Sequence, residues 1–184
     1  MAGDALIKLD LAFDDGTAPL ARPLARHPSE SQRGFALRLA ALLLAWNGRI
    51  EVREGVCRGD EPALSDPGPP RVWFDLVRAD DARRRRALSA ADLHVLVVDA
   101  AARHRDAAPF TGRLAERART WRVDARALED ALANTRRLRG VVERSADSVV
   151  VSSTAPGSDL RVVVRVERDQ SDRRLGSRRD RRRD

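Results

Sequence analysis

Residues 27–46 read HPSESQRGFALRLAALLLAW and predict a buried helix. Ser29 with Gln32 three residues later is typical of a capping box, in which both side chains bind backbone N–H groups at the start of a helix. The apolar residues that follow recur at spacings of three and four, and their common face carries Phe35, Leu39, Leu42, Leu43 and Trp46. Leu37 and Leu44 make the opposite side apolar too. We therefore expect this helix to be the core element against which a sheet packs.

Shorter segments with strand or helix patterns surround this helix. Strands are expected at residues 5–13, 18–26, 49–57, 72–77, 93–98, 120–123, 137–144, 148–153 and 160–166, further helices at 80–91, 109–119 and 124–134, and a proline-rich connection at 58–71. Pro23 favours a place at the sheet edge for the second strand. The pattern predicts an α/β or α+β fold, with a mixed central sheet flanked by helices.

Length and composition are those of one globular domain. The chain has 184 residues, of which 42% are hydrophobic, and no apolar run reaches the ~18–20 residues that cross a membrane. The first residues do not form a secretory signal. Cys57 is the single cysteine, so an internal disulfide and a CxxC metal site are excluded. Since the chain also has no GxGxxG motif and no P-loop, we expect a cytoplasmic, bacterial-type protein with no nucleotide cofactor and no membrane association.

The formal charge of +7 is unevenly distributed along the chain. Residues 168–184 contain eight arginines and four aspartates and account for +4, whereas residues 1–167 carry only +3. Because the end of the chain has almost no apolar residues to bury, we predict a folded domain at 1–167 and a disordered arginine-rich tail at 168–184. The general preference for arginine over lysine is explained either by genome composition or by phosphate binding.

Three acidic positions are candidates for chemistry: Glu30 at the start of the core helix, Asp60 in the connection, and Asp75 inside an apolar strand. A buried carboxylate is costly unless it has a partner. If Asp60 and Asp75 lie at adjacent strand ends, their oxygens and a backbone carbonyl can bind Mg²⁺ and activate a water for attack on a phosphodiester. The alternative is that Asp75 pairs with an arginine and has no further role.

Several strings follow one another in a distinctive order. They are LARHPSES at 24–31, then the apolar helix, GVC at 55–57, GDEP at 59–62, VWFDL at 72–76 and DDARRRRA at 80–87. Together they resemble the YaeQ family of small bacterial proteins, over nearly the whole chain up to about residue 167. The combination of ARHPSE with DEP carries most of this resemblance.

The resemblance implies a fold related to the PD-(D/E)XK nucleases and a family whose biological role is poorly defined. By position, Asp60 and Asp75 correspond to the two metal-binding acids of that superfamily, and the carbonyl of Leu76 completes the metal shell. Glu30 corresponds to the helix-borne acid that some of these enzymes use as an auxiliary ligand. The implied cofactor is Mg²⁺ or Mn²⁺.

The basic residue of the motif corresponds to Arg85 or Arg86 in the following helix. Arginine stabilises phosphate charge but does not release its proton, so it cannot act as the general base. The second acid, Asp75, is also one methylene shorter than the usual glutamate. These two departures predict weak or degenerate catalysis.

Other reactive side chains are assigned structural roles. His27 precedes the helix cap and is expected to form local hydrogen bonds, whereas His94 and His104 have no second ligand at metal-binding spacing. Cys57 is expected to be buried and inert. Trp121 lies between two arginines, and core packing is expected there rather than stacking on a base.

Three functional hypotheses remain open on the sequence. The first is a metal-dependent, nuclease-like phosphodiesterase that acts on DNA or RNA. The second is a non-catalytic module of the same fold that binds nucleic acid or the transcription machinery through a basic surface. The third is a scaffold whose acids form only ion pairs. The sequence sets neither the oligomeric state nor the choice between DNA and RNA.

Overall fold

The computed structural model describes residues 6–53, 61–76, 80–102, 116–155 and 160–168. It contains three helices, α1 (Gln32–Ala45), α2 (Asp81–Ala90) and α3 (Arg126–Asn134). The ten strands are β1 (Leu6–Phe13), β2 (Leu20–Ala25), β3 (Glu51–Val52), β4 (Leu64–Asp66), β5 (Val72–Asp75), β6 (Leu93–Asp99), β7 (Ala118–Asp124), β8 (Arg137–Arg144), β9 (Ser148–Ser153) and β10 (Arg161–Arg168). Within these residues, no helix is long and apolar enough to cross a membrane.

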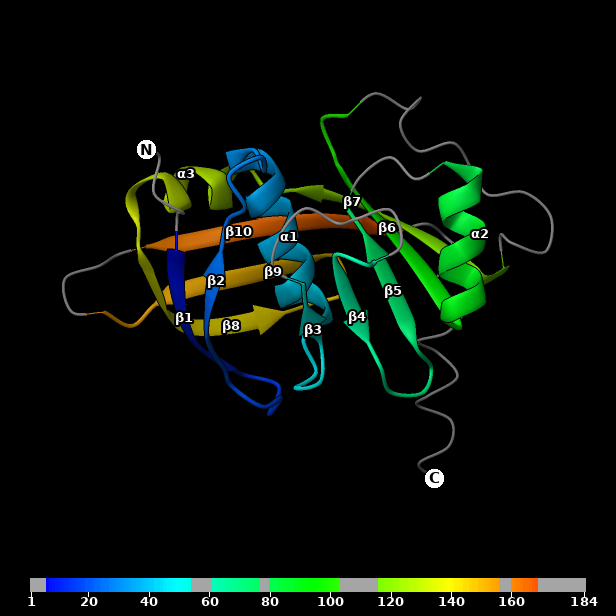
Figure 1. The fold of residues 1–184 in the computed structure, drawn as a ribbon. Coiled ribbons are helices and arrows are strands. Elements are labelled where there is room, and N and C mark those ends of the chain that lie inside the picture. Colours follow the sequence, from blue (N-terminus) through cyan, green and yellow to red (C-terminus); the bar gives the residue numbers. More distant parts are fainter. Residues whose placement is uncertain (1–5, 54–60, 77–79, 103–115, 156–159, 169–184) are drawn as a thin grey trace.

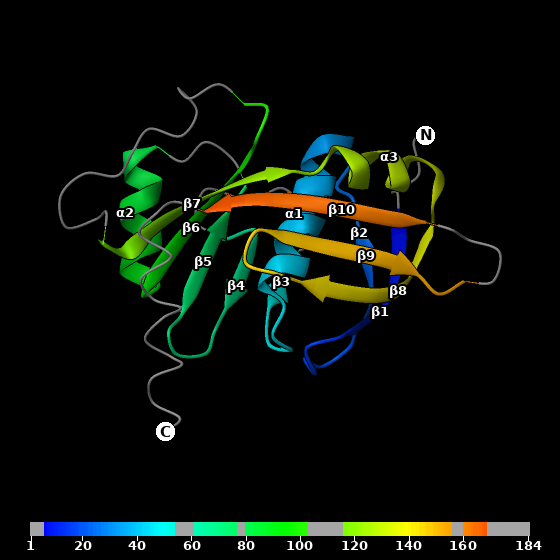
Figure 2. The ribbon, with the colours of Figure 1, turned by 180° about the vertical axis from the view of Figure 1, so that it is seen from behind.

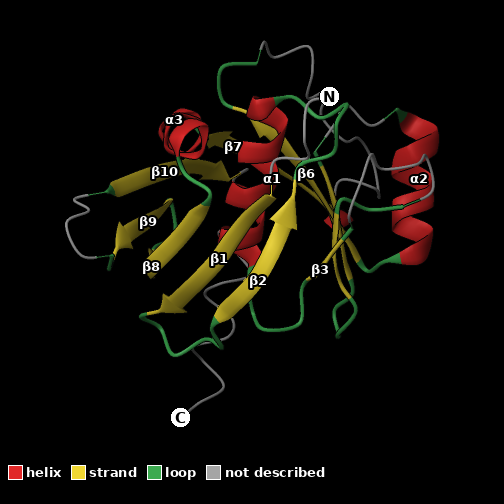
Figure 3. Cartoon of the chain, turned by 60° about the vertical axis from the view of Figure 1, so that its left-hand side comes forward, coloured by secondary structure: helices red, strands yellow, loops and turns green. Residues whose placement is uncertain are grey.

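All ten strands belong to one mixed sheet, in the order β2-β1-β8-β9-β10-β7-β6-β5-β4-β3. Three neighbouring pairs are parallel, namely β1–β8, β5–β6 and β6–β7, and the others are antiparallel. The sheet curves around α1, and α2 lies against the opposite face near β5 and β6 (Figures 1 and 3). This architecture confirms the expected mixed sheet flanked by helices.

The core is organised around α1, as the sequence predicts. Every residue from Phe35 to Leu44 is buried, so the helix contacts apolar side chains all around its axis. The inward side chains of the curved sheet and of α3 pack against it. Leu39, Leu42 and Leu43 have no exposed surface, and each such side chain contributes about 1.5–3 kcal/mol through burial.

The start of α1 differs from the prediction. Ser31, not Ser29, is the N-cap, and its hydroxyl accepts a hydrogen bond of 3.0 Å from the backbone N–H of Gly34. The Ser29 hydroxyl instead lies 2.9 Å from Nδ1 of His27, which confirms the local hydrogen bonding expected of that histidine. A turn closed by the Glu30 N–H and the His27 carbonyl delays the first helical residue to Gln32.

Most strand predictions are confirmed with small changes of boundary. β2 is an edge strand, as Pro23 indicates. β6 is covered on both faces, because Val95 and Val97 join the main core while Leu96 and Val98 face away from it. Asp124 ends β7, and the N-cap of α3 is Ala125. The cap forms no side-chain hydrogen bond, although Asp124 Oδ1 accepts from the Arg126 N–H at 3.2 Å.

Two segments differ more from their predictions. The connection expected at 58–71 contains β4, which pairs with β5. Asp66 ends this strand, and its carboxylate accepts hydrogen bonds from Asn47, Arg49 and the Gly68 N–H. These contacts stabilise a segment that the sequence pattern predicts to be a loop. β7 begins at Ala118, inside the helix expected at 109–119, whose residues up to 115 lie outside the described chain.

β10 ends at Arg168, the residue where the tail is predicted to begin. Its guanidinium lies over the ring of Trp121, 5.1 Å from the centroid. Trp121 itself is only 8% exposed and packs edge-on against Phe74, which confirms the core role expected for it. Residues 169–184 lie outside the described chain, so the tail remains a prediction.

Candidate functional site

Asp75 lies at the end of β5 and is only 1% exposed. In the parallel register, it stands beside Leu96 of β6, and Trp73 stands beside His94. Since side chains alternate along a strand, these four residues share one face of the sheet. It is the face against which α2 packs, because Trp73 clusters with Ala87 of that helix.

Arg83 binds Asp75 directly. Its Nη2 donates to Asp75 Oδ1 at 2.6 Å and to the backbone carbonyl of Glu61 at 3.0 Å. The capping residue of α2, Asp80, accepts a hydrogen bond of 2.7 Å from the Arg83 N–H and so fixes the turn that carries the arginine. One guanidinium nitrogen therefore joins the end of β5 to the segment that begins directly after Asp60.

His94 binds the other oxygen of the same carboxylate. Its Nε2 lies 3.0 Å from Asp75 Oδ2, and the histidine has no exposed surface. Burial raises the pKa of Asp75, but hydrogen bonds from His94 and Arg83 outweigh it and leave this pKa below its usual value. Because an ionised carboxylate can only accept, Nε2 of His94 carries the proton in this contact.

Glu30 lies in a separate ion pair. Arg38 Nε and Nη2 donate to its two carboxylate oxygens at 3.0 and 2.8 Å. Arg38 is 2% exposed and also donates to the carbonyls of Ala25 and Arg53. Within the described residues, no hydrogen bond or ion pair joins Glu30 to Asp75. The arginine thus ties the turn before α1 to the end of β2 and the residue after β3.

The remaining predicted site residues have different surroundings. Asp60 lies outside the described residues, and Leu76 is half-buried against the main core. Arg85 is exposed on α2. The arginine that contacts Asp75 is instead Arg83, two residues earlier in the same helix. Two residues correspond to about 200° around a helix, which turns Arg85 away from the end of β5.

The comparisons with known proteins agree with this fold. The model of the family described as "YaeQ protein" matches residues 14–159, which is most of the chain. The chain belongs to the YaeQ family. Proteins of this family from Escherichia coli K12 and Shigella flexneri, both described as uncharacterized, are 37% identical to it over 71 residues. That match covers 37% of this chain and 39% of each relative, or about two fifths of their length.

Two solved YaeQ structures extend the comparison to nearly the full length of both chains. The protein from Xanthomonas axonopodis pv. citri is 25% identical, with a TM-score of 0.71, over 91% of this chain and 98% of the other. The protein from Pseudomonas syringae is 19% identical, with a TM-score of 0.65, over 91% and 97%. The first supports both family and fold, and the second supports the fold. The relation to PD-(D/E)XK nucleases remains a prediction.

The described donors around Asp75 meet part of what a divalent ion needs. Asp75 is a hard, ionised oxygen donor, and one hydrogen bond on each oxygen leaves further lone pairs available. The Leu76 carbonyl is a second hard donor. Glu30 is less suited, because both its oxygens accept from Arg38. The described residues contain no group of three possible metal ligands, so Asp60 is needed as the second acid.

The sequence interpretation overlooks a second carboxylate, at the end of the neighbouring strand β6. Asp99 ends β6 three residues beyond Leu96 and lies on the sheet face opposite Asp75, where it accepts two hydrogen bonds of 2.6 and 2.7 Å from Arg33 of α1. Arg33 also reaches Glu129 at 3.1 Å. The hydrogen bonds from Arg33 lower the pKa of Asp99 despite its partial burial. An acid directly after the apolar run 93–98 is the signal that indicates this position.

Proposed function

We propose that this YaeQ-family protein is a cytoplasmic, divalent-metal-dependent phosphodiesterase that cleaves nucleic acid slowly. Asp60, Asp75 and the Leu76 carbonyl hold Mg²⁺ or Mn²⁺, and Glu30 is an auxiliary acid. The observation that carries the proposal is the double contact of Arg83. Its Nη2 binds both Asp75 and the carbonyl of Glu61, so the residue next to Asp60 lies close to the Asp75 carboxylate.

The residues around the metal have distinct tasks in this proposal. His94 orients the carboxylate of Asp75 from the buried side, and the lowered pKa keeps that carboxylate ionised and able to bind a cation at neutral pH. Arg83 neutralises part of the acidic charge before substrate arrives. Arg86, the other candidate for the basic residue, lies three residues after Arg83 on nearly the same side of α2, is exposed, and can contact the phosphate groups of a substrate. The bound ion polarises the phosphodiester and lowers the pKa of its water.

Slow turnover is expected because none of the described residues around Asp75 is placed to accept a proton from water. Arginines stay protonated at every physiological pH and cannot take a proton from the attacking water. His94 is fully buried and already donates to Asp75, so it does not reach a solvent-exposed substrate. The ion must therefore activate water without help from a general base.

The test combines metal binding with hydrolysis. Calorimetric titration with Mn²⁺ and cleavage of a single-stranded DNA, a single-stranded RNA and bis(p-nitrophenyl) phosphate are measured for the wild type and for Asp60→Asn and Asp75→Asn. We expect both substitutions to abolish Mn²⁺ binding and hydrolysis. Asp10→Asn, on the solvent face of β1, is the matched control and should change neither. If the folded wild type binds no Mn²⁺, the proposal is wrong.

The binding-module hypothesis is supported by one observation, the exposure of Arg85 and Arg86 on α2 beside the Asp75 cluster. The metal titrations and hydrolysis assays above also distinguish this hypothesis from the phosphodiesterase proposal. Nucleic-acid binding that survives Asp60→Asn and needs no divalent ion, together with no hydrolysis by the wild type, favours a non-catalytic role. Loss of this binding in the double substitution of Arg85 and Arg86 by glutamine would place it on α2.

A further inference from the structure

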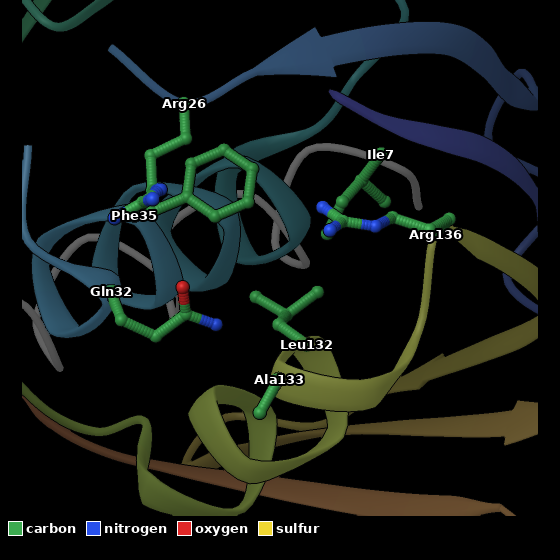
Figure 4. Close-up of a pocket in the computed structure, with 7 residues that line it drawn as sticks. All are labelled: Ile7, Arg26, Gln32, Phe35, Leu132, Ala133 and Arg136. Carbon is green, nitrogen blue, oxygen red and sulfur yellow. The ribbon is translucent and has the colours of Figure 1, made fainter. Parts of the chain in front are cut away.

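A small hollow lies between the start of β1, the first turn of α1 and the end of α3 (Figure 4). Its volume is about 160 Å³. Its large apolar members, Ile7, Phe35 and Leu132, are only 2%, 1% and 5% exposed, so a ligand meets mainly the polar side chains of the lining. No residue of the Asp75 cluster lines the hollow, so its role is independent of the proposed phosphodiesterase site.

The polar lining carries two positive charges. Arg26, Gln32 and Arg136 supply it, and none of the lining residues is acidic. In Figure 4, the side chains of Gln32 and Arg136 extend toward the same space from opposite sides. Among the described residues, neither of these two side chains has a hydrogen-bond or ion-pair partner, and Arg26 donates only to the Glu30 carbonyl, from Nη1 at 3.1 Å. The donors of Gln32 and Arg136 are therefore available to a ligand.

The acids of the adjoining segments do not neutralise these arginines. Glu30, which precedes α1, is bound through both oxygens by Arg38 at 3.0 and 2.8 Å. Glu129 of α3 accepts from Arg33 at 3.1 Å. Asp130, which follows it, is exposed and does not line the hollow. Two guanidinium groups therefore share one small space in which none of the described lining residues supplies a negative charge.

The two helix ends beside the hollow do not change this balance. α1 begins at Gln32 and brings partial positive charge, whereas α3 ends at Asn134 and brings partial negative charge. Each helix end is equivalent to about half an elementary charge, so the two contributions oppose each other. The full charges of Arg26 and Arg136 therefore decide that the complementary ligand is an anion.

A phosphate group matches this set of donors. A guanidinium binds phosphate through two parallel N–H···O bonds, and the Gln32 amide donates to a further oxygen. The three donor side chains come from three segments, and a tetrahedral phosphate presents oxygens in several directions, whereas a carboxylate presents two oxygens on one side. A cavity of about 150 Å³ holds benzene, which has six non-hydrogen atoms, and a phosphate group has five. One phosphate group therefore fits the hollow.

We propose that the hollow binds a single phosphate group, either as inorganic phosphate or as the end of a phosphomonoester. Arg26 is held by its bond to the Glu30 carbonyl and forms the fixed side of the site. Arg136 is exposed and approaches the group from the solvent side. Since Ala133 is exposed as well, the hollow opens to solvent and the remainder of an ester lies outside it. Free phosphate and a phosphorylated molecule share the chemistry that these donors recognise.

The test titrates the full-length protein with sodium phosphate at about pH 7, where a phosphate group carries between one and two charges, and at constant ionic strength without divalent metal. Chemical shifts of backbone amides are recorded, because they separate binding at the hollow from binding to other arginines. Glycerol 3-phosphate, glycerol and acetate are parallel probes. We expect saturable shifts at Gln32, Arg33 and Ala133 for both phosphate compounds, none for glycerol, and at least about tenfold weaker binding of acetate.

The two phosphate compounds distinguish the sources of the group. Equal affinities support a site for free phosphate, and tighter binding of the ester supports a site for a phosphorylated molecule. If neither compound shifts the amides at the hollow, or if acetate binds as tightly as phosphate, the proposal is wrong. A protein that binds no Mn²⁺ and hydrolyses no phosphodiester can still pass this test, so the two proposals fail separately.

Variants test whether the charge at the hollow is responsible for binding. Arg136→Gln removes an exposed guanidinium that has no partner among the described residues, so the protein should stay folded and bind phosphate at least about tenfold more weakly. Arg136→Lys keeps the charge and should stay within about threefold of the wild type, since lysine also binds phosphate. Arg161→Gln removes the same charge from the solvent face of β10 and is the matched control. Unchanged affinity in Arg136→Gln, or an equal loss in Arg161→Gln, overturns the proposal.

Discussion

His94 donates a hydrogen bond of 3.0 Å to Asp75 across two parallel strands, at a place where neither side chain is more than 1% exposed. The other oxygen of the same carboxylate receives Arg83. Because both of its oxygens are hydrogen-bonded in the interior, the Asp75 carboxylate is held in one orientation. Its removal therefore affects two other side chains besides the aspartate.

We expect Asp75→Asn to destabilise the protein by about 3–5 kcal/mol, because the substitution leaves the largely buried Arg83 without its anionic partner. The free energy of unfolding in urea, measured without metal, is the appropriate quantity. Asp10→Asn is the control, since its carboxylate lies in exposed ion pairs. An unchanged stability of Asp75→Asn would contradict this prediction, because it would show that Arg83 and His94 do not depend on the charge of the carboxylate.

Stability should fall in acid. The pKa values of Asp15 and Asp124 are lowered to about 2 by hydrogen bonds, chiefly from Thr17 and Arg126, and those of Asp75 and Asp99 are lowered as well. Below the ordinary value of 3.8, the unfolded chain therefore binds protons that the folded state does not. The free energy of unfolding should be constant near neutral pH and decrease from about pH 5 towards pH 2.

Urea titrations across this pH range test the effect. The Asp99→Asn variant should lose less stability than the wild type between pH 5 and pH 2, because one of the titrating groups is absent. An equal slope in the two proteins would show that Asp99 has the same pKa in the folded and unfolded states.

Gly140→Ala should disrupt the pairing of β8 with β9. A Cβ at this position would lie 2.0 Å from the backbone carbonyl oxygen of Ser152, and a backbone atom cannot move aside as a side chain can. The cost should be about 3 kcal/mol or more, measured by thermal melting and by amide exchange in β9. Ala12→Gly, on the exposed face of neighbouring β1, is the control for a small change of side chain. A melting temperature within 1–2 °C of the wild type, roughly the error of such melts, would contradict the predicted clash.

Deletion of residues 169–184 should leave the melting temperature nearly unchanged, because this tail has almost no apolar residue to bury. The same deletion should weaken binding to single-stranded DNA and flatten its dependence on salt, since arginines on phosphates release counterions. Affinity is measured at several salt concentrations. A tail of the same composition in scrambled order is the control and should restore both properties. Equal slopes with and without the tail would place the binding surface on the folded part.

The elements with local patterns are predictable from the sequence. The helix α1 follows from apolar residues that recur within a few positions, and β6 follows from a continuous apolar run. The N-cap is harder to predict, because Ser29 and Ser31 are both suitable and a turn at His27 selects the later one. The strand β4 depends on contacts of Asp66 with distant residues, which no local pattern contains.

The candidate site is predictable only in part for the same reason. An acid in the apolar segment that forms β5 needs a partner, and this follows from the cost of burial alone. The choice among four consecutive arginines depends on where α2 begins, and the capping contact of Asp80 selects Arg83. The contact of His94 depends on the register between β5 and β6, which becomes visible only in three dimensions.

The position of β10 has a consequence for the order of events during synthesis. This strand is the last of the described strands, yet it lies between β9 and β7 and joins the two groups of described strands on either side (Figure 2). While the chain is still attached to the ribosome, both neighbours of β10 present open edges. The sheet closes only after Arg168 leaves the exit tunnel. A chain that ends before residue 161 would therefore expose two unpaired strand edges. Such edges favour aggregation and degradation by quality-control proteases.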